Sequence, residues 1–463
     1  MKPKVILFIA FLSLFVTVPL VKADWPMFHA DPSHSGVGTG SPVLTPTLLW
    51  KFTTGDSVNY SPVVAKGIVY ISSYDGNLYA LNAKTGEKIW NYNATELGIG
   101  SSPTVADGIV YVGSGDQNRY LYAFDAYSGV LLWTDYVGAS VTDDPTVVNG
   151  VIYLAADGEY DSSNCVLAIN AKTGVEIWNY SSPNGLGCTP AVVNGIVYTA
   201  ANGGYVHAIN AANGEEIWSY SGNGARFLTS PTVVGGILYV GINLAEVGTN
   251  GFYALNATNG AELWKYGISD SNNYVLSTAA VYDGTVYVGS RNGDVYAFNA
   301  ADGNLLWHIM AGHFLFSSPA VIQGIVYIGS GDGNFYAIKG TDGTILWSYP
   351  INSLPGNFVY SSPAYAYGAL YIGSCDNNLY AFGAYTGPTP TINRATITAN
   401  PSPSSTLTVE PKSTLNQATP VIQLFEGQPN SLILLIAIIT TAMMLLTVIA
   451  TVIKRRQWNA NRI

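Results

Sequence analysis

Charged residues are scarce in this chain of 463 residues, at 10%, and the basic ones are scarcer than the acidic ones. There are 19 Lys and Arg against 29 Asp and Glu, so the formal net charge is −10 and the pI is about 4.9. Nucleic-acid binding proteins carry a basic patch or stripe that neutralises phosphates. The composition contains no such footprint, and we therefore expect no nucleic-acid partner.

Cysteine and the familiar catalytic motifs are also nearly absent. The three cysteines, Cys165, Cys188 and Cys375, are not adjacent, and their odd number leaves at least one thiol free or paired between chains. The sequence has no Cys-x-x-Cys-His, Gly-x-Ser-x-Gly or His-Glu-x-x-His motif, which mark attached haem, a hydrolase elbow and a zinc protease. Its five His residues have no regular ligand spacing, so we predict no metal site. A triad assembled only in space leaves no such signature.

Glycine, tyrosine and tryptophan are abundant instead, with 49, 32 and 10 residues. An apolar content of 48% can bury a large core, which excludes disorder for most of the chain. Glycine at this frequency disfavours long helices, because each one costs about 1 kcal/mol in a helix interior. The composition therefore favours an all-β protein with glycine-rich turns.

The two chain ends predict secretion and membrane anchoring. Residues 1–23 read as a signal peptide, with a basic start, an apolar stretch and a small-residue cleavage site at Ala23; an uncleaved anchor helix is the alternative. Residues 431–453 form an apolar run that predicts a transmembrane helix, since as a helix it would be roughly 34 Å long and could cross a bilayer. A buried core helix is the alternative. The basic tail, 454–463, is expected to stay in the cytoplasm.

This topology places residues 24–430 outside a cell membrane that the chain crosses once. The outer part contains twelve basic and all 29 acidic residues, a net charge of −17. Residues 388–430 are rich in Pro, Ser and Thr and predict an extended stalk. Four sequons in the outer part are candidate glycosylation sites, at Asn59, Asn93, Asn179 and Asn256.

Internal repetition is the strongest signal in the sequence. Eight tryptophans recur at intervals of 40 to 46 residues: Trp50, Trp90, Trp133, Trp178, Trp218, Trp264, Trp307 and Trp347. One unit, residues 61–92, divides into four short apolar or aromatic runs separated by turns at Lys66-Gly67, Asp75-Gly76 and 84–86. Repeats of this length with four strands each are typical of propeller blades.

The eighth unit lacks its last strand, because Pro388 and Pro390 follow its turn directly. A spare strand around Trp50, residues 47–53, precedes the first complete unit. We therefore expect an eight-bladed propeller over residues 47–387, closed by this N-terminal strand and preceded by a segment at 24–46. An open solenoid is the alternative, but it would leave Trp50 exposed.

The unit resembles the PQQ-like β-propeller repeat. The match is Ala-x-Asn-x-x-Thr-Gly-x-x-x-Trp from Ala80 to Trp90, similar to the tryptophan-docking motif of that superfamily. The resemblance implies that each Trp packs between neighbouring blades, against the Ala and the Gly peptide of the motif. The superfamily includes quinone-dependent alcohol dehydrogenases and an assembly factor for outer-membrane barrels. The dehydrogenases stack an adjacent Cys-Cys pair on the quinone, and this chain has none.

One face of the predicted propeller carries loops of variable length, and we call it the variable face. It contains the turns after the second strands and the connections between blades, with expansions at 157–164 and 243–250. Variable loops on one face of a repeat array mark the expected binding face, although neutral drift of surface loops gives the same pattern. Residues at the start of each inner strand should rim the channel there. The candidate binding residues are Asp143, Asp144, Arg226, Phe227, His313 and Phe314.

Asp143 and Asp144 are candidates for a cation, whereas Arg226 with the aromatics suits an anion or a sugar. Asp-Gly-Asn sequences such as 75–77 lack the further carboxylates of a calcium loop and indicate hairpin turns. We therefore predict no catalytic residues and no cofactor, with PQQ and calcium unsupported. The leading hypothesis is a non-catalytic surface protein that binds protein or glycan. A quinone-dependent or other oxidoreductase and an envelope assembly factor are the alternatives.

Overall fold

The computed structural model describes residues 24–94, 98–115, 118–156, 165–182, 187–201, 203–223, 226–227, 229–243, 250–268, 274–351 and 358–390. The chain divides into two units, Met1–Asn400 and Pro401–Ile463, and only the first contains described residues. No helix within these ranges is long and apolar enough to span a membrane. The predicted signal peptide, transmembrane helix and cytoplasmic tail, and nearly all of the predicted stalk, lie outside them.

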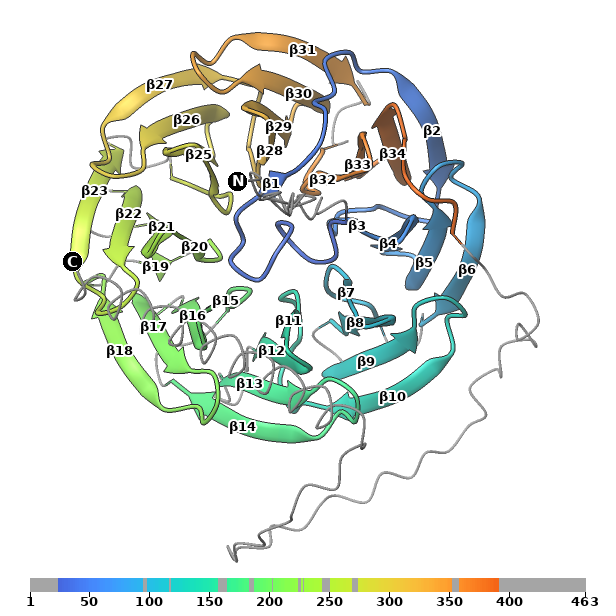
Figure 1. Ribbon diagram of the computed structural model, residues 1–463, viewed down its shortest axis with the longest axis horizontal. Helices are drawn as coiled ribbons and strands as arrows, with labels where there is room; N and C mark the ends of the chain where they lie inside the picture. Colours follow the sequence, from blue (N-terminus) through green and yellow to red (C-terminus); the bar gives the residue numbers. More distant parts are fainter. Residues whose placement is uncertain are drawn as a thin grey trace, which may run out of the picture. The chain divides into compact units, whose positions relative to one another are not determined.

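The strands form eight sheets around a common axis, as Figure 1 shows, and the predicted eight-bladed propeller is confirmed. Blade 1 contains β3 (Val63–Ala65), β4 (Ile68–Ser72), β5 (Asn77–Asn82) and β6 (Lys88–Asn93). Blade 2 contains β7 (Thr104–Ala106), β8 (Ile109–Gly113), β9 (Tyr120–Asp125) and β10 (Leu131–Tyr136). Blade 3 contains β11 (Thr146–Val148), β12 (Val151–Ala156), β13 (Cys165–Asn170) and β14 (Glu176–Ser181). Blade 4 contains β15 (Ala191–Val193), β16 (Ile196–Ala201), β17 (Tyr205–Asn210) and β18 (Glu216–Ser221).

The second half of the ring repeats this order. Blade 5 contains β20 (Thr232–Val234), β21 (Ile237–Asn243), β22 (Asn250–Asn256) and β23 (Glu262–Ile268), and β19 (Arg226–Phe227) pairs with β21. Blade 6 contains β24 (Ala280–Tyr282), β25 (Thr285–Gly289), β26 (Asp294–Asn299) and β27 (Leu305–Met310). Blade 7 contains β28 (Ala320–Ile322), β29 (Ile325–Gly329), β30 (Asn334–Lys339) and β31 (Ile345–Pro350). Blade 8 contains β32 (Ala364–Ala366), β33 (Ala369–Ser374), β34 (Asn378–Gly383) and β2 (Leu48–Thr53).

Blade 8 joins the two ends of the propeller sequence. Its outer strand is β2, which pairs with β34 in antiparallel register, so that Trp50 lies opposite Ala381. In Figure 1 the blue β2 lies beside the orange β34 at the rim of the ring. Pro388 and Pro390 prevent the chain after Gly387 from supplying this strand. The ring is therefore closed by the N-terminal strand, as the repeat pattern predicts.

Seven of the eight outer-strand tryptophans bond the next blade, and the eighth, Trp347, bonds Val43 of the N-terminal segment. The Trp90 indole donates a hydrogen bond of 3.0 Å to the Ala126 carbonyl of blade 2, which also accepts from the Tyr70 hydroxyl at 3.0 Å. Gly129 fits against the Trp90 ring, since a Cβ there would lie 2.7 Å from ring atoms. The other indoles that donate to a backbone carbonyl are Trp50, Trp133, Trp178, Trp218, Trp264, Trp307 and Trp347.

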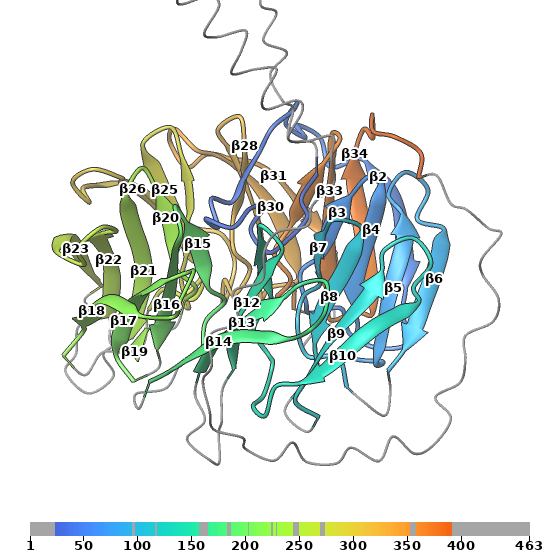
Figure 2. The same cartoon turned by 60° about the horizontal axis from the view of Figure 1, so that its bottom comes forward.

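The N-terminal segment lies inside the ring. Trp25 exchanges two backbone hydrogen bonds with Val64 of β3, and carbonyls farther along the segment accept N–H groups from five more inner strands. Its last part, β1 (Val37–Gly38), pairs in parallel with β28. Figure 1 shows this blue segment within the circle of inner strands, and it remains inside the ring in the tilted view of Figure 2. The segment thus satisfies strand edges that would otherwise be unpaired.

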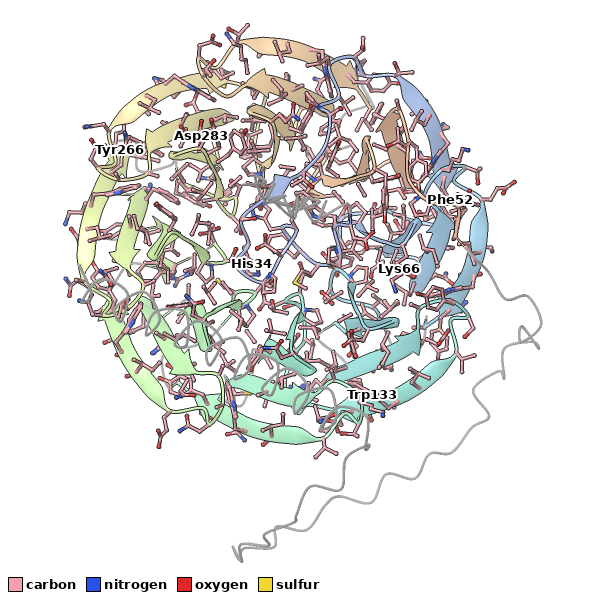
Figure 3. The ribbon with its side chains drawn as sticks, viewed as in Figure 1. His34, Phe52, Lys66, Trp133, Tyr266 and Asp283 are labelled. Carbon is pink, nitrogen blue, oxygen red and sulfur yellow. The ribbon has the colours of Figure 1, made fainter. Side chains whose placement is uncertain are left out.

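Two buried histidines secure this segment. The two ring nitrogens of His29 lie 2.8 Å from the carbonyl oxygens of His34 and Pro319. His34 Nδ1 lies 2.9 Å from the Pro231 carbonyl oxygen, and Figure 3 labels His34 near the centre of the ring. Burial, reinforced by the neighbouring His29, lowers the pKa of His34 to about 4. Burial also lowers the pKa of His29, and a neutral imidazole donates its single N–H to only one of these two carbonyl oxygens. His34 ties the segment to blade 5 as a neutral imidazole near pH 7.

Candidate binding site on the variable face

The face opposite the variable one is built from nearly uniform tight turns. Each joins the first strand of a blade to the second through two residues with positive φ, such as Lys66 at 48° and Gly67 at 80°. This geometry matches the twist of the flanking strands and leaves short loops. The turns after the second strands and the connections between blades lie at the other ends of the strands. Of the two predicted expansions there, 157–164 lies outside the described residues, and so does nearly all of 243–250.

A ring of polar side chains lines the channel where the inner strands begin. In six blades, the residue two positions before the inner strand donates its backbone N–H to the equivalent side chain of the next blade. Three of these bonds run from Thr278 to Ser318, from Ser318 to Ser362 and from Ser362 to Ser61, at 2.9 to 3.0 Å. The ring continues from Ser61 to Ser102, at 2.9 Å. Neighbouring blades are thereby linked at the axis as well as at the outer edge.

Asp144 occupies this ring position in blade 3. Its Oδ1 accepts the Ser102 N–H at 2.6 Å, and its own N–H donates to the Thr189 hydroxyl at 3.1 Å. The side chain is buried, and burial raises the pKa of the carboxyl to about 7 despite the hydrogen bonds from Ser102. Asp144 is therefore a member of the inter-blade ring, and its neighbour Asp143 is half-buried. The described residues contain no group of three or more His, Cys, Asp or Glu suited to a metal ion.

The remaining candidate residues stand at two other blades. Arg226 is exposed at the start of β19, but Phe227 is fully buried and packs in a cluster with Cys188. Phe227 is therefore a core residue, contrary to its predicted place on the rim. His313 is exposed, and its ring lies edge-on to the half-buried Phe314 at 4.6 Å. No described contact joins Asp143, Arg226 and His313, which precede the inner strands of blades 3, 5 and 7.

A different set of residues does come together, and we call it the aromatic arc: Phe316, Phe358, Tyr360, Tyr60 and Tyr74. Phe316 and Tyr360 meet edge to face at 5.0 Å, and Phe358 stacks on Tyr360 at 5.0 Å. Tyr60 and Tyr74 form a second pair at 5.4 Å. Phe316 is 45% exposed and Tyr74 54%, whereas the other three are half-buried. The arc follows the connections into blades 7, 8 and 1 on the variable face.

Polar contacts connect the two halves of the arc. The Cys375 N–H donates to the Phe358 carbonyl at 3.0 Å, and its thiol lies 3.0 Å from Asn59 Oδ1. The Tyr74 N–H donates to the Ser57 carbonyl at 3.0 Å. Burial, with a smaller contribution from Cys375, raises the pKa of the Tyr360 phenol, which therefore stays protonated at neutral pH. Backbone and side-chain bonds of blades 8 and 1 therefore hold Phe358 and Tyr74 in place.

Arg291 continues the surface from one end of the arc. Its guanidinium lies 5.4 Å from the centre of the Tyr274 ring and 5.8 Å from that of Phe314, distances typical of cation–π contacts. By contrast, the described connections into blades 2 to 5 contain a single aromatic residue, the buried Phe227. The aromatic surface therefore occupies one side of the rim.

A cluster between blades 3 and 4 has the order of a hydrolase relay. Ser182 Oγ lies 3.4 Å from His207 Nε2, and His207 Nδ1 lies 2.8 Å from Glu216 Oε2, which also accepts from the Tyr180 hydroxyl. Burial lowers the pKa of His207, although Glu216 opposes this. Ser182, however, is only 2% exposed, so a substrate does not reach its hydroxyl in this structure. The cluster therefore links blades 3 and 4 by hydrogen bonds.

The described residues do not fit the cofactors of the related dehydrogenases. The three cysteines are free thiols on separate blades: Cys188 is buried near β15, Cys165 begins β13, and Cys375 follows β33. None can form the adjacent pair that stacks on a quinone. The sequence at Asp75 is a hairpin turn, because Asp75 Oδ1 accepts the Asn77 N–H at 2.9 Å and Oδ2 accepts the Tyr79 hydroxyl at 2.7 Å. These oxygens serve the turn and do not form a calcium cage.

The fold and its docking pattern define the class of protein: an eight-bladed propeller whose blades are locked by tryptophans. The chain matches the family model described as outer membrane protein assembly factor BamB over residues 44–102, 95–185, 162–281 and 253–460. These segments cover most of the chain, which therefore belongs to this family of PQQ-type repeat proteins. The resemblance seen in the repeat motif is thus confirmed.

Individual relatives are more distant. A quinohemoprotein alcohol dehydrogenase of Comamonas testosteroni is 29% identical over 137 residues, a match that covers 27% of this chain and 19% of the relative. BamB of Moraxella catarrhalis matches with a TM-score of 0.61 and 18% identity, over 75% of this chain and all of that one. The Pseudomonas putida dehydrogenase ADHIIG matches with a TM-score of 0.64 and 15% identity, over 80% and 82%. At these identities the two structures show the shared fold alone.

Sequence reasoning missed the aromatic arc, although a local signal for it exists. Phe316 and Tyr360 each stand directly before a Ser-Ser-Pro sequence that begins an inner strand, whereas the second unit has Gly100 there. An aromatic residue at that position faces the rim of the variable face. Its contact with the neighbouring connection depends on the closed ring, because the connections into blades 7, 8 and 1 come from opposite ends of the sequence.

Proposed function

We propose that this protein is a non-catalytic cell-surface binding or scaffolding protein that recognises protein or glycan through the aromatic arc. The exposure of Phe316 and Tyr74, one from each ring pair of the arc, carries the proposal. Aromatic residues are enriched where proteins bind partners, since a rigid ring loses little entropy and removes much apolar area from water. Conversely, the one relay-like cluster found among the described residues has a buried serine.

The binding experiment uses the full-length protein, purified in detergent and applied to protein and glycan arrays. We expect a specific partner whose binding weakens in Phe316→Ala and Tyr74→Ala variants with unchanged melting temperatures. Tyr136→Ala is the matched control, because Tyr136 is 55% exposed on β10, at the outer edge of blade 2. If both arc variants bind their partner as well as the control does, the arc is not the binding site.

The proposal includes the topology inferred from the chain ends, with a cleaved signal peptide, an external propeller, a stalk and one membrane helix. Epitope tags inserted at residue 395 and after residue 463 test it on intact cells. We expect antibody to reach the first tag without permeabilisation and the second only after it. Equal access to both tags in intact cells would refute a single-pass arrangement.

The predicted glycosylation sites differ in their surroundings. Asn93 and Asn179 are exposed, and Asn256 is half-buried in a turn. Asn59 is half-buried, and its amide oxygen is bonded to the Cys375 thiol. We expect mass spectrometry of the protein from a glycosylating host to detect glycan at Asn93 or Asn179 more often than at Asn59.

The family match favours envelope assembly as a second candidate function. BamB is described as an outer membrane protein assembly factor, and its fold covers three quarters of this chain. A scaffold of this kind would retain several envelope proteins at once. Co-purification from crosslinked membranes would recover them, and recovery of no envelope protein would exclude this role.

A further inference from the structure

We propose that the aromatic arc binds a neutral oligosaccharide chain, an inference that rests on the proposed function and narrows its ligand. Two exposed or half-exposed ring pairs lie on the same rim, Phe316 with Tyr360 and Tyr60 with Tyr74. Flat rings of this kind suit the apolar C–H faces of sugars. Phe316 and Tyr360 stand in the connections into blades 7 and 8, whereas Tyr60 and Tyr74 stand before and within blade 1, so a ligand that covers both pairs must be extended.

The polar groups beside the rings match hydroxyl-rich ligands. Asp56 is exposed, and the one described bond of its carboxylate is the bond that Oδ1 accepts from the Ser57 N–H at 2.7 Å. Asn59 uses its amide oxygen for the Cys375 thiol, and no described partner takes its amide nitrogen. The Tyr74 hydroxyl also has no described hydrogen bond, and its ring is 54% exposed. Carboxylate acceptors next to amide and phenol donors suit a sugar hydroxyl, which both donates and accepts.

Charge argues against an acidic ligand. The described parts of the connections into blades 7, 8 and 1 contain no Lys or Arg, and Asp56 adds a negative charge beside the Tyr60–Tyr74 pair. The cation next to the arc is Arg291, at the end away from that pair, and its guanidinium packs over the Tyr274 and Phe314 rings. The predicted external part of the chain has a net charge of −17. A uronic-acid chain or an acidic peptide would meet like charges, which disfavour binding. A neutral glycan has no such penalty, and the aromatic faces then supply the attraction.

Isothermal titration calorimetry of the full-length protein in detergent tests the proposal, with neutral and acidic hexasaccharides as probes. The neutral probes are β-1,4-linked and β-1,3-linked glucohexaose and mannohexaose, and the acidic probe is hexagalacturonate. We expect at least one neutral probe to bind and its trisaccharide to bind about tenfold more weakly, because a shorter chain covers one ring pair only. Phe316→Ala and Tyr74→Ala should each weaken binding about tenfold, with Tyr136→Ala unchanged.

The other outcomes show whether the neutral-glycan inference fails alone or together with the proposed binding function of the arc. Absence of binding by every neutral probe, or equal binding of hexagalacturonate, would overturn the neutral-glycan inference. A peptide or protein partner lost in the same arc variants, without glycan binding, would also overturn it while sustaining the proposed function. If the arc variants leave all recognised partners bound, both proposals fail. A Tyr74→Phe variant, which keeps the ring, should retain most of the affinity if stacking on the ring is the main contribution.

Discussion

Asp144 should make the stability of the propeller depend on pH, and replacing it by Ser should remove that dependence. The native carboxyl has a pKa of about 7, against an ordinary value of 3.8, because it is buried in the channel ring. Each pKa unit corresponds to about 1.36 kcal/mol, so ionisation in the folded state costs about 4 kcal/mol. Ser is the residue that the ring has at Ser102 and Ser318, and its hydroxyl can accept the same N–H.

The direction follows from the raised pKa. Below pH 3.8, Asp144 is protonated in both the folded and the unfolded state and costs no stability. As the pH rises toward about 7, the carboxyl ionises in the unfolded state first, and the free energy of unfolding falls. We therefore expect Asp144→Ser to match the wild type near pH 4 and to be more stable by about 4 kcal/mol at pH 8. With an unfolding entropy of about 2.1 cal/mol/K per residue over roughly 360 residues, the melting temperature rises by about 5 °C.

Thermal unfolding followed by circular dichroism between pH 4 and pH 8 measures this difference. A matched variant, Ser362→Asp, places a second carboxyl at the equivalent position of blade 8. Its melting temperature should fall below that of the wild type as the pH rises from 4 to 8. Parallel pH profiles for the wild type and Asp144→Ser would refute the reasoning, because the carboxyl would then titrate as it does in the unfolded chain.

Two further predictions concern the docking contacts and the channel. Gly86→Ala should destabilise by about 3 kcal/mol more than Gly150→Ala in chemical denaturation. Both glycines have positive φ, but a Cβ at Gly86 would lie 2.7 Å from the Trp50 ring, whereas nothing lies within 4 Å at Gly150; equal effects would argue against a tightly docked Trp50. His34→Gln, which keeps a donor for the Pro231 carbonyl, should abolish a loss of about 3 kcal/mol that the wild type suffers from pH 6.5 to 4, since burial depresses the His34 pKa to about 4. Thermal melts with the same pH slope in both proteins would contradict this.

Much of the fold was readable from the repeat. Tyrosine, alanine, glycine and tryptophan recur at constant offsets, so the number of blades, the strand order and the turns followed from one unit. The missing outer strand of the eighth unit and the spare strand at Trp50 predicted the closure. These features are local or periodic, and one-dimensional order is enough to identify them.

The site was much less readable. Asp144 looks like a surface acid in the sequence, yet it replaces Ser in a buried ring whose partners, Ser102 and Thr189, belong to other blades. Phe227 looks like a rim aromatic, but its short strand pairs with β21 and turns the ring into the core. Whether a side chain faces solvent depends on its non-local neighbours, which no offset in the sequence encodes.

The eight blades, their turns and their closure follow from the repeat alone. Each unit buries its apolar runs in the same way, and the eighth unit lacks an outer strand that the segment around Trp50 can supply. The positions of the N-terminal segment at the axis and of the aromatic arc on the rim depend on contacts between distant parts of the chain. The tertiary structure placed the N-terminal segment on the inner strands and joined Asn59, next to Tyr60, to Cys375, whose N–H bonds the Phe358 carbonyl. Ring closure makes neighbours of residues about 300 positions apart, and that proximity exists only once all the blades have docked.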